Sequence, residues 1–382
     1  MNDIEQLRFR IAVDDGLIED LDGRLRKARW PEVPEGSPWE FGTSQPYLRG
    51  VIDYWIHDFD WKKMEDGLNA FAHYRIPVDG RNHHCVVERG TGDNPIPLVL
   101  FHGWPGCFTE YLPVAQRLTR AASTGKGATV VVVSLPGAGF SESSGRPIGP
   151  RDVGGIWHRI LTEQLGISRY ALHGGDWGAA VSSWMAVDFP ASVLGIHLTS
   201  PILQPDAAAL DPPLSEDEAA FLAARSARGP WEFGYQVVQG TKPLTLSYGL
   251  TDSPLGLAAW LLEKFHGWSA SKGKDEYPPF DLDDLLTIVT LHWVAGPGPA
   301  TWMYRSIIDG TGLRVPADTR VSVPTWLCRF GDDISPQSPE SWQERVYDVV
   351  HRTEVAYGSH FPGLDATEPL VEDLLKFIRS VS

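Results

Sequence analysis

Short apolar and β-branched runs alternate with helical patterns along the chain from about residue 93 onward. The runs that predict strands lie at 96–101, 128–134, 169–174, 193–200, 323–330 and 353–358. Helical stretches or glycine- and proline-rich loops separate them, as parallel βαβ units require. The pattern predicts an α/β fold with a mostly parallel central sheet and helices on both of its faces.

Two segments depart from this alternation. Residues 1–92 contain helical patterns with aromatic faces, among them LIEDLDGRLRKARW and YLRGVIDYWIHDFDW, which we interpret as packing surfaces of an N-terminal extension. Residues 205–316 lack convincing strands and show three helical patterns instead, SEDEAAFLAARSA, SPLGLAAWLLEKF and FDLDDLLTIVTLHWVA. We therefore predict a helical cap at 205–316, inserted between two parts of the core at 93–204 and 317–382.

The composition is typical of a folded chain with a sizeable core. Hydrophobic residues make up 42% of the 382 residues and charged residues 21%, which excludes a disordered or coiled-coil chain. Lys and Arg number 33 against 49 Asp and Glu, which gives a net charge of −16. Because nucleic acids and anionic membranes bind clustered cations, this charge argues against both as partners.

The cysteines and histidines give no metal-ligand pattern. Cys85, Cys107 and Cys328 are scattered and form no C-x-x-C pair, so we expect neither a disulfide framework nor a cysteine zinc site. The adjacent His83 and His84 lack an i,i+4 partner, and we interpret them as a solvated turn. The first residues lack the apolar stretch of a signal peptide, and no apolar run is long enough to span a membrane. These features predict a cytoplasmic protein without a metal.

The strongest local motif is GGDWG, which follows the predicted strand at 169–174 and precedes a helical pattern. A strand, a glycine-rich turn and a helix form the nucleophile elbow of an α/β-hydrolase, where the usual motif is G-x-S-x-G. Here the central residue is Asp176, so the nucleophile would be a carboxylate. Alone, the motif is equally compatible with an ordinary turn in which Asp176 caps the helix.

Two further features favour the elbow. HGWPG follows the strand at 96–101, where this fold places one donor of an oxyanion hole; the other is the residue after the nucleophile. The expected donors are the backbone N–H groups of Trp104 and Trp177, and His102 is interpreted as a structural residue of that loop. In this fold an acid and then a histidine follow late strands of the sheet. The sequence has Asp333, preceded by Asp332, and then His360, in that order.

An aspartate nucleophile restricts the reactions that the site could catalyse. A carboxylate can attack saturated carbon and form an ester, which water then cleaves at the enzyme's own carboxyl carbon. A serine alkoxide attacking the same carbon would leave an ether that a histidine and water cannot hydrolyse. The motif therefore points away from esterases and peptidases, and toward the opening of an epoxide or the displacement of a halide.

In combination, these motifs resemble the microsomal-type epoxide hydrolases of the α/β-hydrolase fold, including their bacterial relatives. The resemblance covers nearly the whole chain and rests on IPVDGRNHHCVVERG, HGWPG, PGAGFSE, GGDWG, TKPLTLSYGLTDSPLGLAAWLLEKF and GSHF. It implies an enzyme without a cofactor that acts on a small-molecule epoxide and water. It also implies two cap tyrosines that donate a proton to the epoxide oxygen, which match Tyr235 and Tyr304, with Tyr248 as the alternative to Tyr304. Alignment on VPT places Asp333, rather than Asp332, as the acid.

The resemblance implies that an epoxide is converted to a vicinal diol through a covalent ester on Asp176. Fifteen tryptophans and the aromatic cap agree with a bulky or aromatic epoxide. Similarity to bacterial members of natural-product pathways extends this expectation to biosynthesis of the enediyne type. Two alternatives remain open at this point, a haloalkane dehalogenase, which also uses Asp followed by Trp, and a non-catalytic ligand-binding protein on the same fold. A homo-oligomer also stays open.

Overall fold

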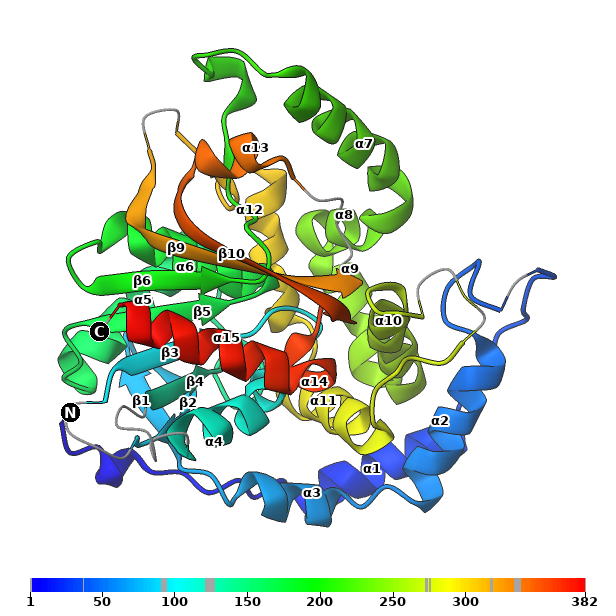
Figure 1. Cartoon of the computed structure of the whole chain (residues 1–382). Helices are drawn as coiled ribbons and strands as arrows, with labels where there is room; N and C mark the ends of the chain where they lie inside the picture. The colour runs from blue at the N-terminus through cyan, green and yellow to red at the C-terminus, as the bar shows by residue number, and fades with distance from the viewer. Residues whose placement is uncertain are drawn as a thin grey trace.

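In the computed structural model, an eight-stranded sheet forms the centre of the molecule (Figure 1). The structure describes residues 2–36, 38–90, 95–120, 128–271, 274, 276–316, 319–332 and 338–381, without the side chains of Pro230 and Asp332. The strand order is β1-β2-β4-β3-β5-β6-β9-β10. The pairs β1/β2 and β2/β4 are antiparallel and all other neighbours are parallel, so the predicted mostly parallel α/β sheet is confirmed.

Every run that predicted a strand forms one. The strands are β3 (Pro97–Phe101), β4 (Thr129–Val133), β5 (Tyr170–Gly174), β6 (Val193–Leu198), β9 (Val321–Asp332) and β10 (Tyr347–Ser359). All five residues of β4 and of β5 are buried, because helices cover both faces of the sheet. Strands that are buried on both faces appear in the sequence as continuous apolar runs.

Two further strands come from the predicted N-terminal extension, β1 (His73–Val78) and β2 (Arg81–Glu88). They contain His83 and His84, which are buried in β2, so the interpretation of this pair as a solvated turn was wrong. His84 Nδ1 lies 2.7 Å from Ser134 Oγ, and its Nε2 lies 2.9 Å from His73 Nδ1. Hydrogen bonds of this kind offset the cost of burying polar side chains.

Helices cover the sheet on both sides (Figure 1). On one face, α15 (Thr367–Ser380) packs against α4 (Leu112–Arg120); on the other, α5 (Pro150–Arg159) packs against α6 (Asp176–Asp188). The remaining core elements are short: η1 (Glu5–Leu7), η2 (Phe108–Tyr111), the π-helix η4 (Ile160–Gln164), α13 (Glu340–Glu344) and α14 (Pro362–Asp365). None of the described helices combines the length and apolar character that a bilayer crossing requires.

The helices between β6 and β9 gather at one end of the sheet (Figure 1). They are α7 (Glu216–Glu232), α8 (Gly234–Thr241), α9 (Pro243–Asp252), α10 (Pro254–Gly267), α11 (Leu282–Ala295), η6 (Pro299–Tyr304) and α12 (Arg305–Ile308). A short turn, η5 (Ala207–Ala209), and the strand pair β7 (Gln204–Pro205) and β8 (Arg314–Val315) flank them. The N-terminal helices α1 (Asp15–Arg26), α2 (Gln45–His57) and α3 (Trp61–Leu68) pack against α10 and α11. These contacts join the N-terminal segment to the helices that follow β6.

A buried ion pair anchors the first of these helices to the core. Ser215 caps α7, and Glu218 completes the capping box, as the SEDE motif predicted. Both oxygens of Glu218 also accept hydrogen bonds from Arg345, at 2.7 and 2.8 Å, and the Glu218 side chain is fully buried. The hydrogen bonds from Arg345 lower the pKa of Glu218 to about 2. A bidentate pair of this kind holds the start of α7 in a fixed place.

Replacing Glu218 with Gln should destabilise the protein in a pH-dependent way. The folded pKa lies below the ordinary value of 4.5, so the stabilisation is present above that pH and is lost as the pH falls toward about 2. We expect E218Q to lower the free energy of unfolding on the order of 3 kcal/mol at pH 7. The difference should shrink below pH 4 in urea unfolding curves. A difference that does not change between pH 7 and pH 3.5 would contradict the assignment.

Candidate active site

The GGDWG motif forms a sharp turn between β5, which ends at Gly174, and α6, which begins at Asp176. Asp176 has a φ of +48°, a left-handed conformation that is costly for a residue with a side chain. Close packing makes the neighbouring glycines necessary. A Cβ atom on Gly178 would collide with the carbonyl of Phe101, and one on Gly103 would collide with Asp176 itself. The turn therefore places the Asp176 carboxylate directly beside the loop after β3.

This position is the topological switch point of the sheet. β3 lies between β4 and β5, so the chain leaves β3 toward one side of the sheet and later returns to its other side. The carboxyl ends of such strands form a crevice that binds ligands. Here the backbone N–H of Trp104, in the loop after β3, donates a hydrogen bond to Asp176 Oδ1 at 2.9 Å. The loop expected to supply an oxyanion donor thus contacts the expected nucleophile.

His360 reaches the same carboxylate from the loop after β10. Its Nε2 lies 3.6 Å from Asp176 Oδ2, and both side chains are largely buried. The backbone N–H of His360 donates to the carbonyl of Trp268 at 3.1 Å, and the Trp268 ring lies edge-on to the imidazole at 5.1 Å. The base expected from chain order therefore lies beside the nucleophile. Asp333 falls outside the described residues, so its predicted position next to His360 stays a prediction.

Two tyrosines line the same cavity as Asp176. The cavity has a volume of about 80 Å³, and its lining includes Asp176, His360, Tyr235 and Tyr304. The two tyrosine rings lie 5.6 Å apart. Tyr248 is 72% exposed and does not line this cavity, so of the two alternatives for the second tyrosine only Tyr304 lies near the nucleophile.

Tryptophans hold both tyrosines in place. The Trp104 ring stacks on Tyr235 at 5.1 Å, and the Trp177 ring lies edge-on to Tyr304 at 5.0 Å. Burial, reinforced by the negative charge of Asp176, raises the pKa of Tyr235 above its ordinary value of 10.0. Burial and the neighbouring Tyr235 raise the pKa of Tyr304 as well. Both hydroxyls therefore keep their protons at neutral pH and are able to donate them.

His102 has the structural role expected of it. Its Nε2 accepts a hydrogen bond from the backbone N–H of Leu135, and its Nδ1 lies 2.8 Å from the carbonyl of Gly103. Burial lowers its pKa to about 4, so it is neutral near pH 7. The ring thus fixes the loop that carries Trp104.

One cluster among the described residues has the geometry of a metal site, His197, Cys328 and Asp373. These side chains are hydrogen-bonded: His197 Nε2 lies 3.0 Å from Asp373 Oδ2, and Thr353 donates to the other carboxylate oxygen. None of the three lines the cavity that contains Asp176. These hydrogen bonds join β6, β10 and α15.

Sequence reasoning missed Glu110, a buried acid in η2, the short helix that follows HGWPG. Its carboxylate packs so closely on Gly106 that a Cβ atom there would overlap it, and its backbone carbonyl approaches Gly363, close to His360. Burial raises the pKa of Glu110 to about 8, with a smaller opposing effect from His360. The residue was not singled out because its burial is created by α14 and the His360 loop, which are far away in sequence.

Substituting Glu110 with Gln should change how stability depends on pH. The folded protein keeps this proton up to about pH 8, whereas the unfolded chain releases it near 4.5, so Glu110 makes folding less favourable as the pH rises between these values. We expect E110Q to gain stability relative to the parent protein between pH 5 and pH 8, measured by urea unfolding. A parallel pH dependence in the two proteins would show that Glu110 ionises normally.

Comparisons with known proteins identify the family to which the chain belongs. The family profile described as Epoxide hydrolase N terminus matches residues 6–111, and the alpha/beta hydrolase fold profile matches residues 96–230. Epoxide hydrolase 1 of Sus scrofa is 31% identical and aligns over 97% of this chain and 88% of its own. The crystal structure of juvenile hormone epoxide hydrolase from Bombyx mori superposes with a TM-score of 0.83 at 28% identity, covering 98% of this chain and 93% of that one. The Aspergillus niger enzyme superposes with a TM-score of 0.82 at 25% identity, covering 98% and 96%.

Proposed function

Because the chain belongs to the epoxide hydrolase family of α/β-hydrolases, whose members are hydrolases acting on ether bonds, we propose that it opens epoxides through a covalent ester on Asp176. The observation that carries this proposal is the shared cavity. A carboxylate in a strained elbow lies there together with His360 and two protonated tyrosines. Family membership argues against the haloalkane dehalogenase and ligand-binding alternatives.

In the first step, Asp176 attacks one carbon of the epoxide ring. A carboxylate oxygen forms a bond to that carbon, and the bond between this carbon and the ring oxygen breaks. The electron pair stays on the ring oxygen, which takes a proton from Tyr235 or Tyr304. The location of both tyrosines at the cavity supports this role, and their hydroxyls are protonated at neutral pH because burial favours the neutral form. The product of this step is a hydroxyalkyl ester of Asp176.

In the second step, water attacks the carboxyl carbon of that ester. His360 removes a proton from the water, and the 3.6 Å between its Nε2 and the Asp176 carboxylate places it in range. The N–H of Trp104 already donates to Asp176 Oδ1, where the tetrahedral negative charge would develop; the N–H of Trp177 is the proposed second donor. When the intermediate collapses, the bond between the carboxyl carbon and the substrate oxygen breaks, and that oxygen takes the proton held by His360, which gives the vicinal diol. The proton of the regenerated Asp176 carboxyl group returns to the tyrosinate. We assign Asp333 as the acid that orients His360, on the strength of the resemblance and chain order.

The proposal divides the roles between segments. The core at 93–204 and 317–382 supplies Asp176 and His360, the cap at 205–316 supplies the tyrosines, and the extension at 1–92 supports the cap. The aromatic walls of the cavity support a bulky or aromatic epoxide as substrate. The resemblance to bacterial natural-product enzymes supports a biosynthetic role. The three cysteines are free thiols, which supports a reducing cytoplasm.

Replacing His360 with Gln should trap the ester, because the first step does not need the histidine and the second does. We expect intact-protein mass spectrometry of H360Q incubated with styrene oxide to show an adduct with the mass of one epoxide molecule. Peptide mapping should place it on Asp176. The matched control, D176N/H360Q, should form no adduct.

An experiment in heavy-oxygen water tests whether water attacks the carboxyl carbon of the same ester. A single turnover in heavy-oxygen water should place the label in the Asp176 carboxylate rather than in the diol. If diol forms while the Asp176 peptide stays unlabelled, direct attack of water on the epoxide replaces the covalent mechanism. Release of halide from chloroalkanes without any diol formation would instead favour a dehalogenase.

Removing the hydroxyl groups of the two cavity tyrosines should slow ring opening, because the ring oxygen then lacks its proton donors. We expect Y235F and Y304F each to lower kcat roughly tenfold or more, and the double variant to lower it roughly a hundredfold to ten-thousandfold. Tyr248→Phe is the matched control, because this tyrosine is exposed and lies outside the cavity. Stopped-flow tryptophan fluorescence should show the loss in the alkylation step. An equal loss in Y248F would contradict the assignment of Tyr304.

A further inference from the structure

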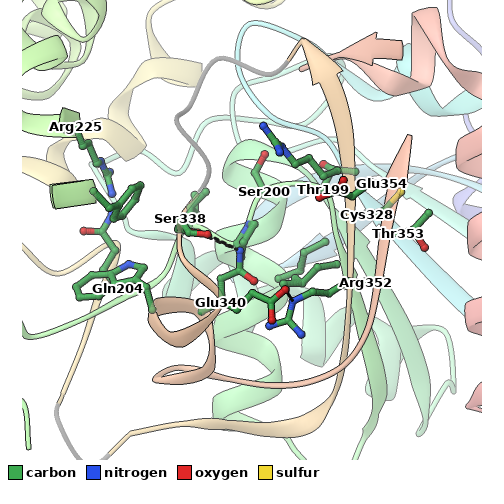
Figure 2. A pocket seen from close by; sticks show the side chains of 18 residues that line it. Thr199, Ser200, Gln204, Arg225, Cys328, Ser338, Glu340, Arg352, Thr353 and Glu354 are labelled. Carbon is green, nitrogen blue, oxygen red and sulfur yellow. Dashed lines mark hydrogen bonds and ion pairs between the residues drawn. The ribbon is translucent and has the colours of Figure 1, made fainter. Parts of the chain in front are cut away.

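A second cavity, shown in Figure 2, shares lining residues with the one that contains Asp176. It has a volume of about 150 Å³ and lies between the first cap helix and strands β9 and β10. Three residues line both cavities: Ser200, Ile202 and Arg225. A substrate that fills the first cavity could therefore extend past these residues into the second.

Arg225 is the cation at this junction. It comes from α7, and Figure 2 shows it on the same side of the cavity as Gln204, across from Arg352 and Thr353. No described residue forms an ion pair or a hydrogen bond with its guanidinium. The side chain is half-buried, and burial lowers its pKa.

Other arginines nearby do have acidic partners. Arg352, on the opposite wall, lies 2.9 Å from Glu344 and 3.6 Å from Glu340. Arg228, one turn further along α7, lies 3.8 Å from Glu232. Arg225 thus differs from both, because no ion pair joins it to a described residue, although Glu340 and Glu354 line the far wall of the same cavity.

An unpaired, partly buried guanidinium is costly unless an anion offsets it. A guanidinium also matches the planar, two-oxygen geometry of a carboxylate better than any other side chain does. A carboxylate of the ligand would supply the ion-pair partner that Arg225 lacks among the described residues.

We propose that Arg225 binds a carboxylate group of the substrate, so that the protein prefers epoxides bearing a negative charge at the end of the molecule away from the oxirane. The oxirane would lie at Asp176, and the carboxylate would lie where the two cavities meet. This inference rests on the proposed function, since it names the class of epoxide that the same site accepts.

The test compares a carboxylate substrate with its neutral counterpart. The probes are 4-(oxiran-2-yl)benzoate and its methyl ester, which share the styrene oxide framework and differ in charge. We expect kcat/KM for the benzoate to exceed that for the ester roughly tenfold to a hundredfold, the range of a hydrogen bond to a charged group. The preference should appear mainly in KM.

Variants of two arginines on the same helix identify the group responsible. R225M removes the charge and keeps the length of the side chain, and it should reduce the ratio between the two substrates to near one. R225K should retain part of the preference, since the charge remains. The matched control is R228M, whose ratio should equal that of the parent protein because Arg228 lines neither cavity.

The outcomes separate this proposal from the function it rests on. If the parent protein shows no preference for the benzoate, or if R225M lowers both rates equally, Arg225 does not recognise the carboxylate. If neither epoxide is hydrolysed, the proposed function fails, and a binding experiment then tests the role of Arg225. Calorimetry with 4-(1,2-dihydroxyethyl)benzoate and its methyl ester should then show a preference for the acid in the parent protein that R225M loses. Equal binding of both diols by the parent protein would overturn the proposal.

Discussion

The hydrogen bond from the Trp104 backbone to the Asp176 carboxylate is the contact on which the site depends. It exists because two parallel neighbours, β3 and β5, end at the same edge of the sheet and send their loops toward each other. The left-handed backbone conformation of Asp176 is energetically unfavourable. The close packing around Gly103 and Gly178, where no Cβ atom fits, holds the residue in that conformation. The same N–H is already in place for negative charge that develops on this carboxyl group during hydrolysis.

The negative charge of Asp176 also acts on its surroundings, in addition to burial. Burial, and to a lesser extent Asp176, raise the pKa of Tyr235 and so favour its neutral form. Glu110 is affected in the same direction by Asp176, whereas His360 opposes the shift. Burial therefore favours the neutral form of both the tyrosine and the glutamic acid that lie near the nucleophile.

The sequence could specify those parts of the fold that follow from local patterns. Buried parallel strands such as β4 and β5 are continuous apolar runs, and the elbow and the HGWPG loop have fixed spacing from them. The sequence did not predict β1 and β2, because the burial of His73 and His84 depends on hydrogen bonds to each other and to Ser134, which no local pattern reveals. The choice between Tyr304 and Tyr248 likewise depends on packing, since exposure alone separates them. The assignment of Asp333 as the acid that orients His360 rests on chain order and on the resemblance.

The geometry of α7 links the anchoring of the cap to recognition at the cavity. Residues three to four and seven positions apart share one face of a helix, so Glu218, Phe221 and Arg225 point in a common direction. Glu218 pairs with Arg345, the Phe221 ring lies 6.2 Å from Trp342, and Arg225 reaches the junction of the two cavities. The first two contacts fix the rotation of the helix about its own axis. A helix that is held at its first turn therefore presents Arg225 toward the cavity two turns later, so that the buried ion pair determines where the charge lies as well as how firmly the cap is attached.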